Sequence, residues 1–514
     1  MIARHSQQVN QGGEMSNTDA APPHDSKGMT RREALASGTT LAVSRLAAQV
    51  SIPGALAALA AVGDARAQGA APNIVYIISD DLGWKDVGYH GSDIKTPNID
   101  RLAAGGTRLE QFYAQPMCTP TRAALLTGRY PFRYGLQTAV IPQSGTYGLA
   151  LDEHPLPQML KDAGYYTAMS GKWHLGHSKT AYWPRQRGFD SFYGALLGEI
   201  DHFTHKAATG NKDWYRNNKA LKEEGFDNIL FGTEAVRLIN NHDQKQPLFL
   251  YLAFTAPHTP YQGPQEYLDR NSHIADENRR KYAAMISVMD DEIGKVVEAL
   301  EKRGMRDNTL IVFQSDNGGV VNPFFAGESE VKGKLPPDNG PYREGKGTTY
   351  EGGTRVVCLV NWPGKIKPGT IDGTMHVVDM YPTLAGLAGA KPAKNKPLDG
   401  IDMWPTLSEG KPSPRTEVVY NLEPMVGTVR EGDWKLVWKA ALPQKIELFD
   451  LSKDESETID LAGQNPEMVR KLQARITELA AEMAPPLIMQ DAVKLLLHAP
   501  TLLPDPSEMF NVRD

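Results

Sequence analysis

The chain of 514 residues has few cysteines, a small net charge and no internal repeat. Its two cysteines, Cys118 and Cys358, are too few for a disulfide scaffold. Cys358 lies in the apolar run 356–360, where we expect a small buried thiol in a strand. The formal net charge of −6 gives no sign of a nucleic-acid-binding surface, so we expect no nucleic-acid partner. The length allows two domains or one large domain with an appendage, and no sequence signal indicates an oligomeric state.

Residues 1–67 are expected to form an export signal rather than part of the fold. Residues 30–35 (TRREAL) fit a twin-arginine motif, the apolar stretch 46–62 follows, and 65–67 (ARA) provides a cleavage site. A membrane anchor is the alternative, but an apolar stretch of about 17 residues broken by Pro53 is short for a span. We therefore expect twin-arginine export machinery as a partner, and a periplasmic or secreted protein. The long segment before the two arginines leaves three candidate translation starts: Met1, Met15 and Met29.

Four nearly continuous apolar runs predict strands that are buried on both faces of a parallel sheet. They cover residues 73–79, 166–170, 248–254 and 309–314. Helices are predicted between these runs, at 155–163 and at 277–303, the second with apolar residues at helical spacing. This alternation predicts an α/β fold with a mostly parallel sheet between helices.

The pattern changes after residue 412. Short alternating runs at 417–420, 434–438 and 447–449 predict a small antiparallel sheet, and 466–483 predicts a helix. We therefore expect three parts, which are the export signal 1–67, a large α/β domain over 68–412 and a small sheet-and-helix domain over 413–514.

Acidic side chains follow two of the predicted strands. Asp80 and Asp81 come after 73–79, and Asp316 and Asn317 come after 309–314. In open α/β sheets, functional groups gather beyond the carboxyl ends of the strands. Three carboxylates and an amide are hard oxygen donors that suit calcium or magnesium better than zinc. Each pair alone is also ordinary turn chemistry.

Residues 118–129 (CTPTRAALLTGR) place a thiol just before a predicted helix. Pro120 suits the first turn of a helix, which we expect over 121–127, with Gly128 ending it. A helix N-terminus favours an anion, and Arg122 adds a positive charge one turn from Cys118. From these residues alone, a buried structural cysteine is an equally good interpretation.

The complete run resembles the sulfatase signature, Cys-x-Pro-x-Arg followed by Leu-Thr-Gly-Arg. The resemblance covers residues 71–461, and segments 133–137, 151–153 and 196–199 are most similar to the arylsulfatase B (N-acetylgalactosamine 4-sulfatase) type. It implies an alkaline-phosphatase-like catalytic domain over 68–412, followed by a smaller sheet domain. It also implies hydrolysis of sulfate monoesters, with aryl sulfates as substrates in vitro and a sulfated carbohydrate as the natural one.

In that family the signature cysteine is oxidised to formylglycine, an aldehyde whose hydrate is the nucleophile. The resemblance therefore implies that Cys118 is modified, with a formylglycine-generating enzyme as a transient partner. It further implies that Asp80, Asp81, Asp316 and Asn317 bind one calcium ion, with the modified Cys118 completing the shell.

The resemblance also implies a set of groups that act on the sulfate. This catalytic set is Cys118, Arg122, Lys172, His174, His258 and Lys346. Lys172 and His174 follow the strand 166–170 and lie two residues apart, so an extended backbone would point both to one side. Lys172, Lys346 and His258 are implied to hold sulfate oxygens, and one of them to protonate the leaving oxygen. His174 is implied to remove a proton when sulfate is released.

The surroundings of this set carry two further expectations. Segment 324–341, rich in glycine, proline and charge, predicts a surface loop over the site, and 143–148 and 199–212 are expected to be further specificity loops. Glu344 lies two residues before Lys346, where it would repel a sulfate. We expect it to point away or to contact the non-sulfated part of the substrate.

Two other functions remain open at this point. A phosphate or phosphonate ester hydrolase of the same superfamily would use the same cations. A non-catalytic protein that binds sulfated glycans would keep the pocket and leave Cys118 unmodified.

Overall fold

The computed structural model describes residues 71–327, 331–392 and 396–497. The predicted export signal, residues 1–67, therefore lies outside the described residues, as do residues 498–514. In the described part of the chain, no helix is long and apolar enough to cross a membrane.

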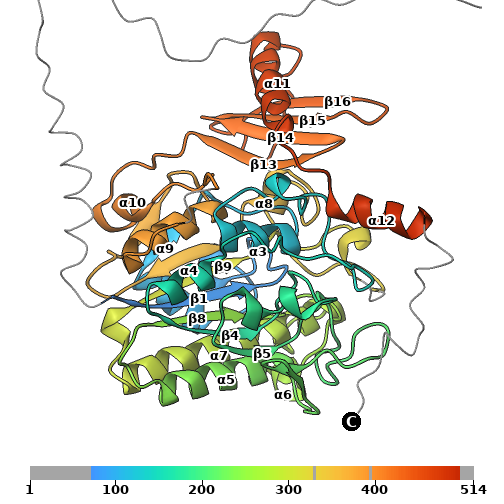
Figure 1. Cartoon of the computed structure of the whole chain (residues 1–514). Helices are drawn as coiled ribbons and strands as arrows, with labels where there is room; N and C mark the ends of the chain where they lie inside the picture. Colours follow the sequence, from blue (N-terminus) through green and yellow to red (C-terminus); the bar gives the residue numbers. More distant parts are fainter. Residues whose placement is uncertain (1–70, 328–330, 393–395, 498–514) are drawn as a thin grey trace, which may run out of the picture. The chain divides into compact units, whose positions relative to one another are not determined.

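A ten-stranded sheet forms the centre of the fold (Figure 1), in the order β11-β2-β10-β9-β1-β8-β4-β5-β6-β7. Its five central strands are parallel. They are β9 (Thr309–Ser315), β1 (Asn73–Ser79), β8 (Leu248–Ala253), β4 (Tyr166–Gly171) and β5 (Ser191–Gly194). The mostly parallel sheet is confirmed, and the four apolar runs match β1, β4, β8 and β9 to within one residue at each end.

The outer strands are mixed in direction. β10 runs antiparallel to β9 and β2, and β6 runs antiparallel to β5 and β7. Their bounds are β2 (Thr107–Leu109), β6 (Tyr215–Arg216), β7 (Lys219–Ala220), β10 (Cys358–Asn361) and β11 (Gly369–Ile371). A separate pair joins β3 (Phe112–Tyr113) to β12 (Met375–His376). Cys358 is buried at the start of β10, as predicted.

Helices cover both faces of the sheet. Side chains of β1 alternate between two apolar clusters, one on each face, and each cluster includes residues of several helices. Tyr76 and Ile78 pack in the cluster formed with α3 (Cys118–Thr127), α4 (Leu156–Asp162) and α9 (Met380–Ala388). Val75 and Ile77 pack in the cluster formed with α2 (Pro97–Ala104), α5 (Asp227–Asn241) and α7 (Glu277–Lys302). Figure 1 shows these two helical layers on opposite sides of the sheet. Further helices among the described residues are α6 (Gln265–Arg270), α8 (Glu351–Thr354), α10 (Trp404–Glu409) and α12 (Leu487–Leu497).

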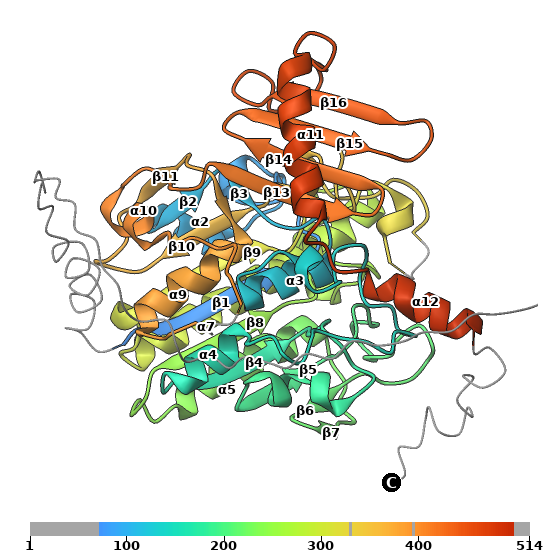
Figure 2. The ribbon, with the colours of Figure 1, turned by 45° about the horizontal axis from the view of Figure 1, so that its top comes forward.

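A second, four-stranded antiparallel sheet follows, with α11 (Pro466–Ala480) packed across it (Figure 2). Its strands are β13 (Glu417–Glu423), β14 (Val426–Glu431), β15 (Trp434–Lys439) and β16 (Lys445–Asp450). β14 is not among the predicted strands. β14 is buried on both faces. Thr428 and Arg430 contact Thr349 and Tyr113 of the large domain, whereas Val429 packs in the apolar cluster with α11, so the strand shows no apolar–polar alternation.

The two sheets share one apolar core. Val419 of β13 and Leu472 of α11 belong to the same buried cluster as Tyr76 of β1. The predicted domain boundary at residue 412 stays a prediction.

Candidate active site

Four polar side chains meet where β1 and β9 end. The strands are paired in register up to Ser79 and Ser315, so the residues that follow are neighbours. The backbone N–H of Asp81 donates to Oδ1 of Asp316 at 3.2 Å, and Nδ2 of Asn317 donates to Oδ1 of Asp81 at 2.7 Å. The structure therefore brings both acidic strand ends together, and their role as metal ligands stays a prediction.

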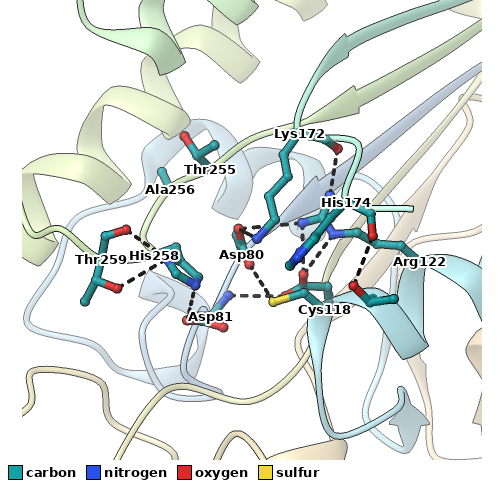
Figure 3. Close-up of polar contacts among 12 residues, drawn as sticks. Asp80, Asp81, Cys118, Arg122, Lys172, His174, Thr255, Ala256, His258 and Thr259 are labelled. Atoms are coloured by element: carbon teal, nitrogen blue, oxygen red, sulfur yellow. Dashed lines mark hydrogen bonds and ion pairs between the residues drawn. The ribbon is translucent and has the colours of Figure 1, made fainter. Parts of the chain in front are cut away.

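Helix α3 brings Cys118 to this cluster. The helix begins at Cys118 itself, three residues earlier than predicted, because Met117 is still extended and serves as the N-cap. Pro120 is compatible with this start, since N–H groups of the first turn have no partner within the helix. Sγ of Cys118 donates to Oδ1 of Asp80 at 3.3 Å (Figure 3). Burial raises the pKa of the Cys118 thiol well above its ordinary value, and Asp316 and Asp80 add to that effect.

Arg122 lies one turn further along α3 and is fully buried. Its Nε and Nη2 donate to Oδ2 of Asp316 at 3.1 and 2.9 Å, and its Nη1 donates to the backbone oxygen of Lys172 at 3.0 Å. Since these bonds use three sides of the guanidinium, Arg122 joins the helix to the ends of β9 and β4 in one fixed geometry.

Two buried lysines neutralise the aspartates after β1. Nζ of Lys172 lies 2.5 Å from Oδ2 of Asp80, and Nζ of Lys346 lies 2.8 Å from Oδ2 of Asp81. Burial alone would raise the pKa of Asp80, but Lys172 and the other nearby cations hold it well below its ordinary value. Gly171 permits the turn before Lys172, because a Cβ there would lie 1.8 Å from the backbone oxygen of Ala253.

His174 sits on a left-handed backbone, with φ of 57°, rather than on the extended backbone that we expected. Its Nε2 donates to the backbone oxygen of Ile141 at 3.1 Å, which assigns the proton to that nitrogen. Its Nδ1 is buried and has no hydrogen-bond partner among the described residues, so it is left as a proton acceptor. Gly198 makes room for the ring, since a Cβ there would lie 2.1 Å from Cε1 of His174.

His258 follows β8 and faces the same cluster (Figure 3). Its Nδ1 donates to the backbone oxygen of Thr259 at 2.8 Å, while its Nε2 lies 3.2 Å from Nζ of Lys346 and 3.5 Å from Oδ2 of Asp81. All ten predicted site residues therefore meet at one end of the sheet. Their roles in the reaction stay predictions.

The sequence did not indicate the residue that supports His258. The buried His202 donates from Nε2 to the backbone oxygen of His258 at 3.1 Å, and its Nδ1 lies 2.9 Å from Oδ2 of Asp227. Burial lowers the pKa of His202, but the adjacent Asp227 outweighs it and raises the pKa above its ordinary value. Its only sequence signal is a histidine in a loop, which is too weak to single it out.

A pocket with a volume of about 260 Å³ leads to these groups. Cys118, His174, His258 and Lys346 lie along it, together with residues of three loops. These loop residues are Thr138, Ala139, Val140, Ile141, Pro142, Gln143, Leu197, Gly198, Glu199, Phe324, Phe325 and Gly327. Of the predicted loop 324–341, Phe324, Phe325 and Gly327 line the pocket, whereas residues 335–337 are buried and do not line it. Glu344 is exposed and is not among the pocket-lining residues, as expected.

The site also has the donors for a hard cation. Ligand atoms of Asp80, Asp81, Cys118 and His258 all lie within 4.8 Å of one another. Oδ1 of Asn317 is buried beside them without a hydrogen-bond partner in the described part of the chain. An unpaired buried amide oxygen next to carboxylates is a suitable ligand for calcium or magnesium.

Comparisons with known proteins agree with this site. Residues 72–390 match the Sulfatase family, and residues 345–482 match the family N-sulphoglucosamine sulphohydrolase, C-terminal. Arylsulfatase J of Mus musculus is 36% identical over 471 residues, which cover 80% of this chain and 76% of that protein. Arylsulfatase A of Homo sapiens is 34% identical over 453 residues, 78% of this chain and 86% of that protein.

N-acetylgalactosamine-6-sulfatase of Mus musculus is 36% identical over 363 residues, 66% of this chain and 67% of that protein. The crystal structure of Ps i-CgsB in complex with k-i-k-neocarrahexaose has a TM-score of 0.75 and 33% identity, covering 86% of this chain and 99% of that one. Because the relatives include several sulfatase types, the arylsulfatase B type stays a prediction. The chain belongs to the sulfatase family and is a sulfuric ester hydrolase.

Proposed function

We propose that this enzyme hydrolyses the sulfate monoester of a carbohydrate, using one calcium ion and a formylglycine made from Cys118. The observation that carries the proposal is the pocket that ends at Cys118, where Lys346, His174 and His258 surround the first residue of α3. The sugar part is supported by the relative named N-acetylgalactosamine-6-sulfatase and by the oligosaccharide bound to Ps i-CgsB.

Asp80, Asp81, Asp316 and Asn317 would hold the calcium ion. Three carboxylates in the site face three cations, Arg122, Lys172 and Lys346, so these groups are close to neutral together. A divalent cation adds two positive charges, which a singly charged sulfate ester and an anionic nucleophile would offset. When bound, calcium supplies charge stabilisation for the sulfate oxygens and favours the deprotonated nucleophile.

The hydrate of formylglycine at position 118 supplies two hydroxyl groups on one carbon, one to attack sulfur and one to expel the sulfate. The residues around it position and protonate the substrate. Lys346, which lines the pocket, and the buried Lys172 would bind sulfate oxygens, and Arg122 keeps α3 aligned with the strand ends. His174, with its unpaired Nδ1, is suited to take up a proton when sulfate is released.

His258 is suited to protonate the leaving oxygen. Since its Nδ1–H is already donated to Thr259, the proton for the leaving group must come from Nε2. In the neutral ring Nε2 carries no proton, so His258 must first take one up there from solvent. Burial and the Lys346 ammonium, 3.2 Å from Nε2, lower the pKa of His258 and so favour giving that proton to the leaving oxygen. A sugar alkoxide is a poor leaving group and needs this proton.

This function can be tested by measuring turnover of a panel of sulfated mono- and disaccharides, beside nitrophenyl sulfate and nitrophenyl phosphate. We expect turnover of at least one sulfated sugar and of nitrophenyl sulfate, with much slower turnover of the phosphate. Faster turnover of the phosphate would favour the phosphate or phosphonate ester hydrolase instead. Hydrolysis of nitrophenyl sulfate with no sulfated sugar would contradict a carbohydrate substrate.

The location of the enzyme is part of the proposal. The twin-arginine motif at 30–35 supports export of the folded enzyme to the periplasm or the medium, after a formylglycine-generating enzyme has acted. Changing Arg31→Lys together with Arg32→Lys should retain the protein in the cytoplasm with its leader uncleaved, as fractionation and mass measurement would show. Normal recovery of the double variant outside the cytoplasm would contradict this route.

A further inference from the structure

The outer part of the pocket carries an aromatic pair that the sulfate chemistry does not use. Phe324 is 84% exposed, and its ring meets the ring of Phe325 edge-on, with centroids 5.0 Å apart. Both rings line the pocket, as does Glu199 from another loop. An exposed aromatic ring at the rim of a pocket offers apolar surface on which a ligand can pack.

Residues adjacent in sequence to Lys346 and His258 hold the aromatic pair in place. Phe325 packs on Gly347, next to Lys346, so closely that a Cβ there would lie 2.4 Å from the Phe325 ring. On the other side, the hydroxyl of Thr259, next to His258, donates to the backbone oxygen of Ala326. The segment is therefore fixed between the two groups that we expect to contact the sulfate and the leaving oxygen.

The geometry of the pocket defines what must touch this pair. Sulfate would lie at the inner end, beside the buried Cys118 and Lys346, so the group esterified to it must fill the outer part. A volume of about 260 Å³ is slightly below the usual range for ligand pockets, roughly 300–1,000 Å³. One ring is the size of group that this space suits.

Glu199 would distinguish between the two kinds of ring that can stack on an aromatic side chain, a phenyl ring and a pyranose. Both a phenyl ring and the C–H face of a pyranose would stack on Phe324. A carboxylate, however, binds hydroxyl donors, which a pyranose has and a simple aryl ring lacks. The same carboxylate repels a second sulfate or carboxylate on the ring.

Resting on the proposed function, we propose that Phe324, Phe325 and Glu199 form the subsite for the sugar, and that they select a pyranose with a single sulfate. The phenylalanines contact its C–H face and Glu199 accepts hydrogen bonds from its hydroxyl groups. A ring with a second anionic group is disfavoured, so the subsite makes the enzyme specific for monosulfated, otherwise neutral sugar units.

The test uses the full-length, formylglycine-containing enzyme with galactose 4-sulfate and galactose 6-sulfate. Each is compared with the disulfate that carries an additional sulfate at position 2. For the faster monosulfate, Phe324→Ala should raise KM roughly fivefold, while Phe324→Trp should keep it within about twofold. Inhibition by inorganic sulfate, which reaches only the inner end, should keep its Ki in both variants. Glu199→Gln should raise KM for the monosulfate. It should also reduce the ratio of kcat/KM for the monosulfate to that for the disulfate at least threefold.

Leu442→Ala is the matched control, because Leu442 is 95% exposed and does not line the pocket. It should leave every constant unchanged. If the wild-type enzyme hydrolyses a sulfated galactose and neither Phe324→Ala nor Glu199→Gln changes its KM, the subsite is wrong although the proposed function stands. An increased Ki for inorganic sulfate in Phe324→Ala would also overturn it, because the change would then act on the sulfate end. Turnover of nitrophenyl sulfate alone would instead contradict the proposed function on which the subsite rests.

Discussion

At the scale of single residues, the two histidines of the site differ in the partners of their ring nitrogens. His174 presents an unpaired Nδ1, whereas His258 has its Nδ1–H bound to Thr259 and its Nε2 beside Lys346. His174 is therefore arranged to accept a proton at Nδ1, whereas His258 can give one only from Nε2. Cys118 is the small, buried first residue of α3, so replacing it would change the chemistry of the site more than its packing.

Replacing Cys118 with alanine should abolish sulfate ester hydrolysis and leave the fold intact, because the change removes one small side chain. The thermal unfolding midpoint and turnover of nitrophenyl sulfate measure the two effects. In the unchanged protein, the peptide containing residue 118 should react with a carbonyl probe. Cys358→Ala is the control, since it removes the other buried thiol, and it should remain active. An active Cys118→Ala enzyme would contradict the role of residue 118.

The two histidine variants should fail at different steps. His258→Ala should slow release of the alcohol, and more for a sugar sulfate than for nitrophenyl sulfate, because nitrophenolate leaves without a proton. His174→Ala should release alcohol in the first turnover at a near-normal rate and then release sulfate slowly. Rapid-mixing experiments that follow alcohol and sulfate separately make the comparison. The reverse pattern would exchange the two roles.

At the scale of elements, the second sheet is tied to the segment that carries Lys346. Nζ of Lys435 on β15 lies 2.8 Å from Oε1 of Glu351, the first residue of α8, and 2.7 Å from Oε1 of Glu457. All three side chains are buried. The loop with Lys346 leads directly into α8, so this ion network links the small sheet to the catalytic lysine.

Lys435→Met should lower the free energy of unfolding by about 3–5 kcal/mol, because it leaves Glu457 buried without its cation and Glu351 with the more distant Arg355, at 3.7 Å. Urea unfolding followed by fluorescence measures the change. Lys471→Met provides the control, since the Lys471–Glu431 pair on α11 and β14 is largely exposed and should contribute less than about 1 kcal/mol. Equal effects of the two substitutions would show that the buried network does not anchor the second sheet.

At the scale of the whole molecule, the active site joins segments from most of the chain. Lys346 and Asp81 are 265 residues apart in sequence and Arg122 and Asp316 are 194 apart, yet each pair is in direct contact. A metal ion that bound these strand ends would therefore stabilise the native state as a unit.

Removing calcium with a chelator should lower both the thermal unfolding midpoint and the activity. Because the ion would bind the folded chain and not the unfolded one, calcium at a hundredfold excess over its Kd should add about 2.7 kcal/mol of stability. Calorimetry with added calcium, added magnesium and neither ion measures the shift. Asn317→Ala should fold but lose most of the response, since it removes the unpaired buried oxygen. A midpoint that did not respond to calcium in the wild-type enzyme would contradict this site.

The sequence by itself determined four of the five central parallel strands and the α/β class, and its resemblance to the sulfatase signature indicated the residues that meet at the site. It could do so because strands buried on both faces are continuous apolar runs, and because Cys118, Lys172 and the acidic strand ends lie within local motifs. β5 was not predicted. Only the tertiary structure decided the rest. β14 escaped detection because it is buried on both faces without an apolar–polar alternation, and His202 lies in a loop without a pattern of its own. The loops of Glu199 and Phe324 were predicted, but not which of their side chains line the pocket. Their importance comes from contacts between segments that are distant in sequence, and such contacts exist only once the sheet has brought those loops to one edge.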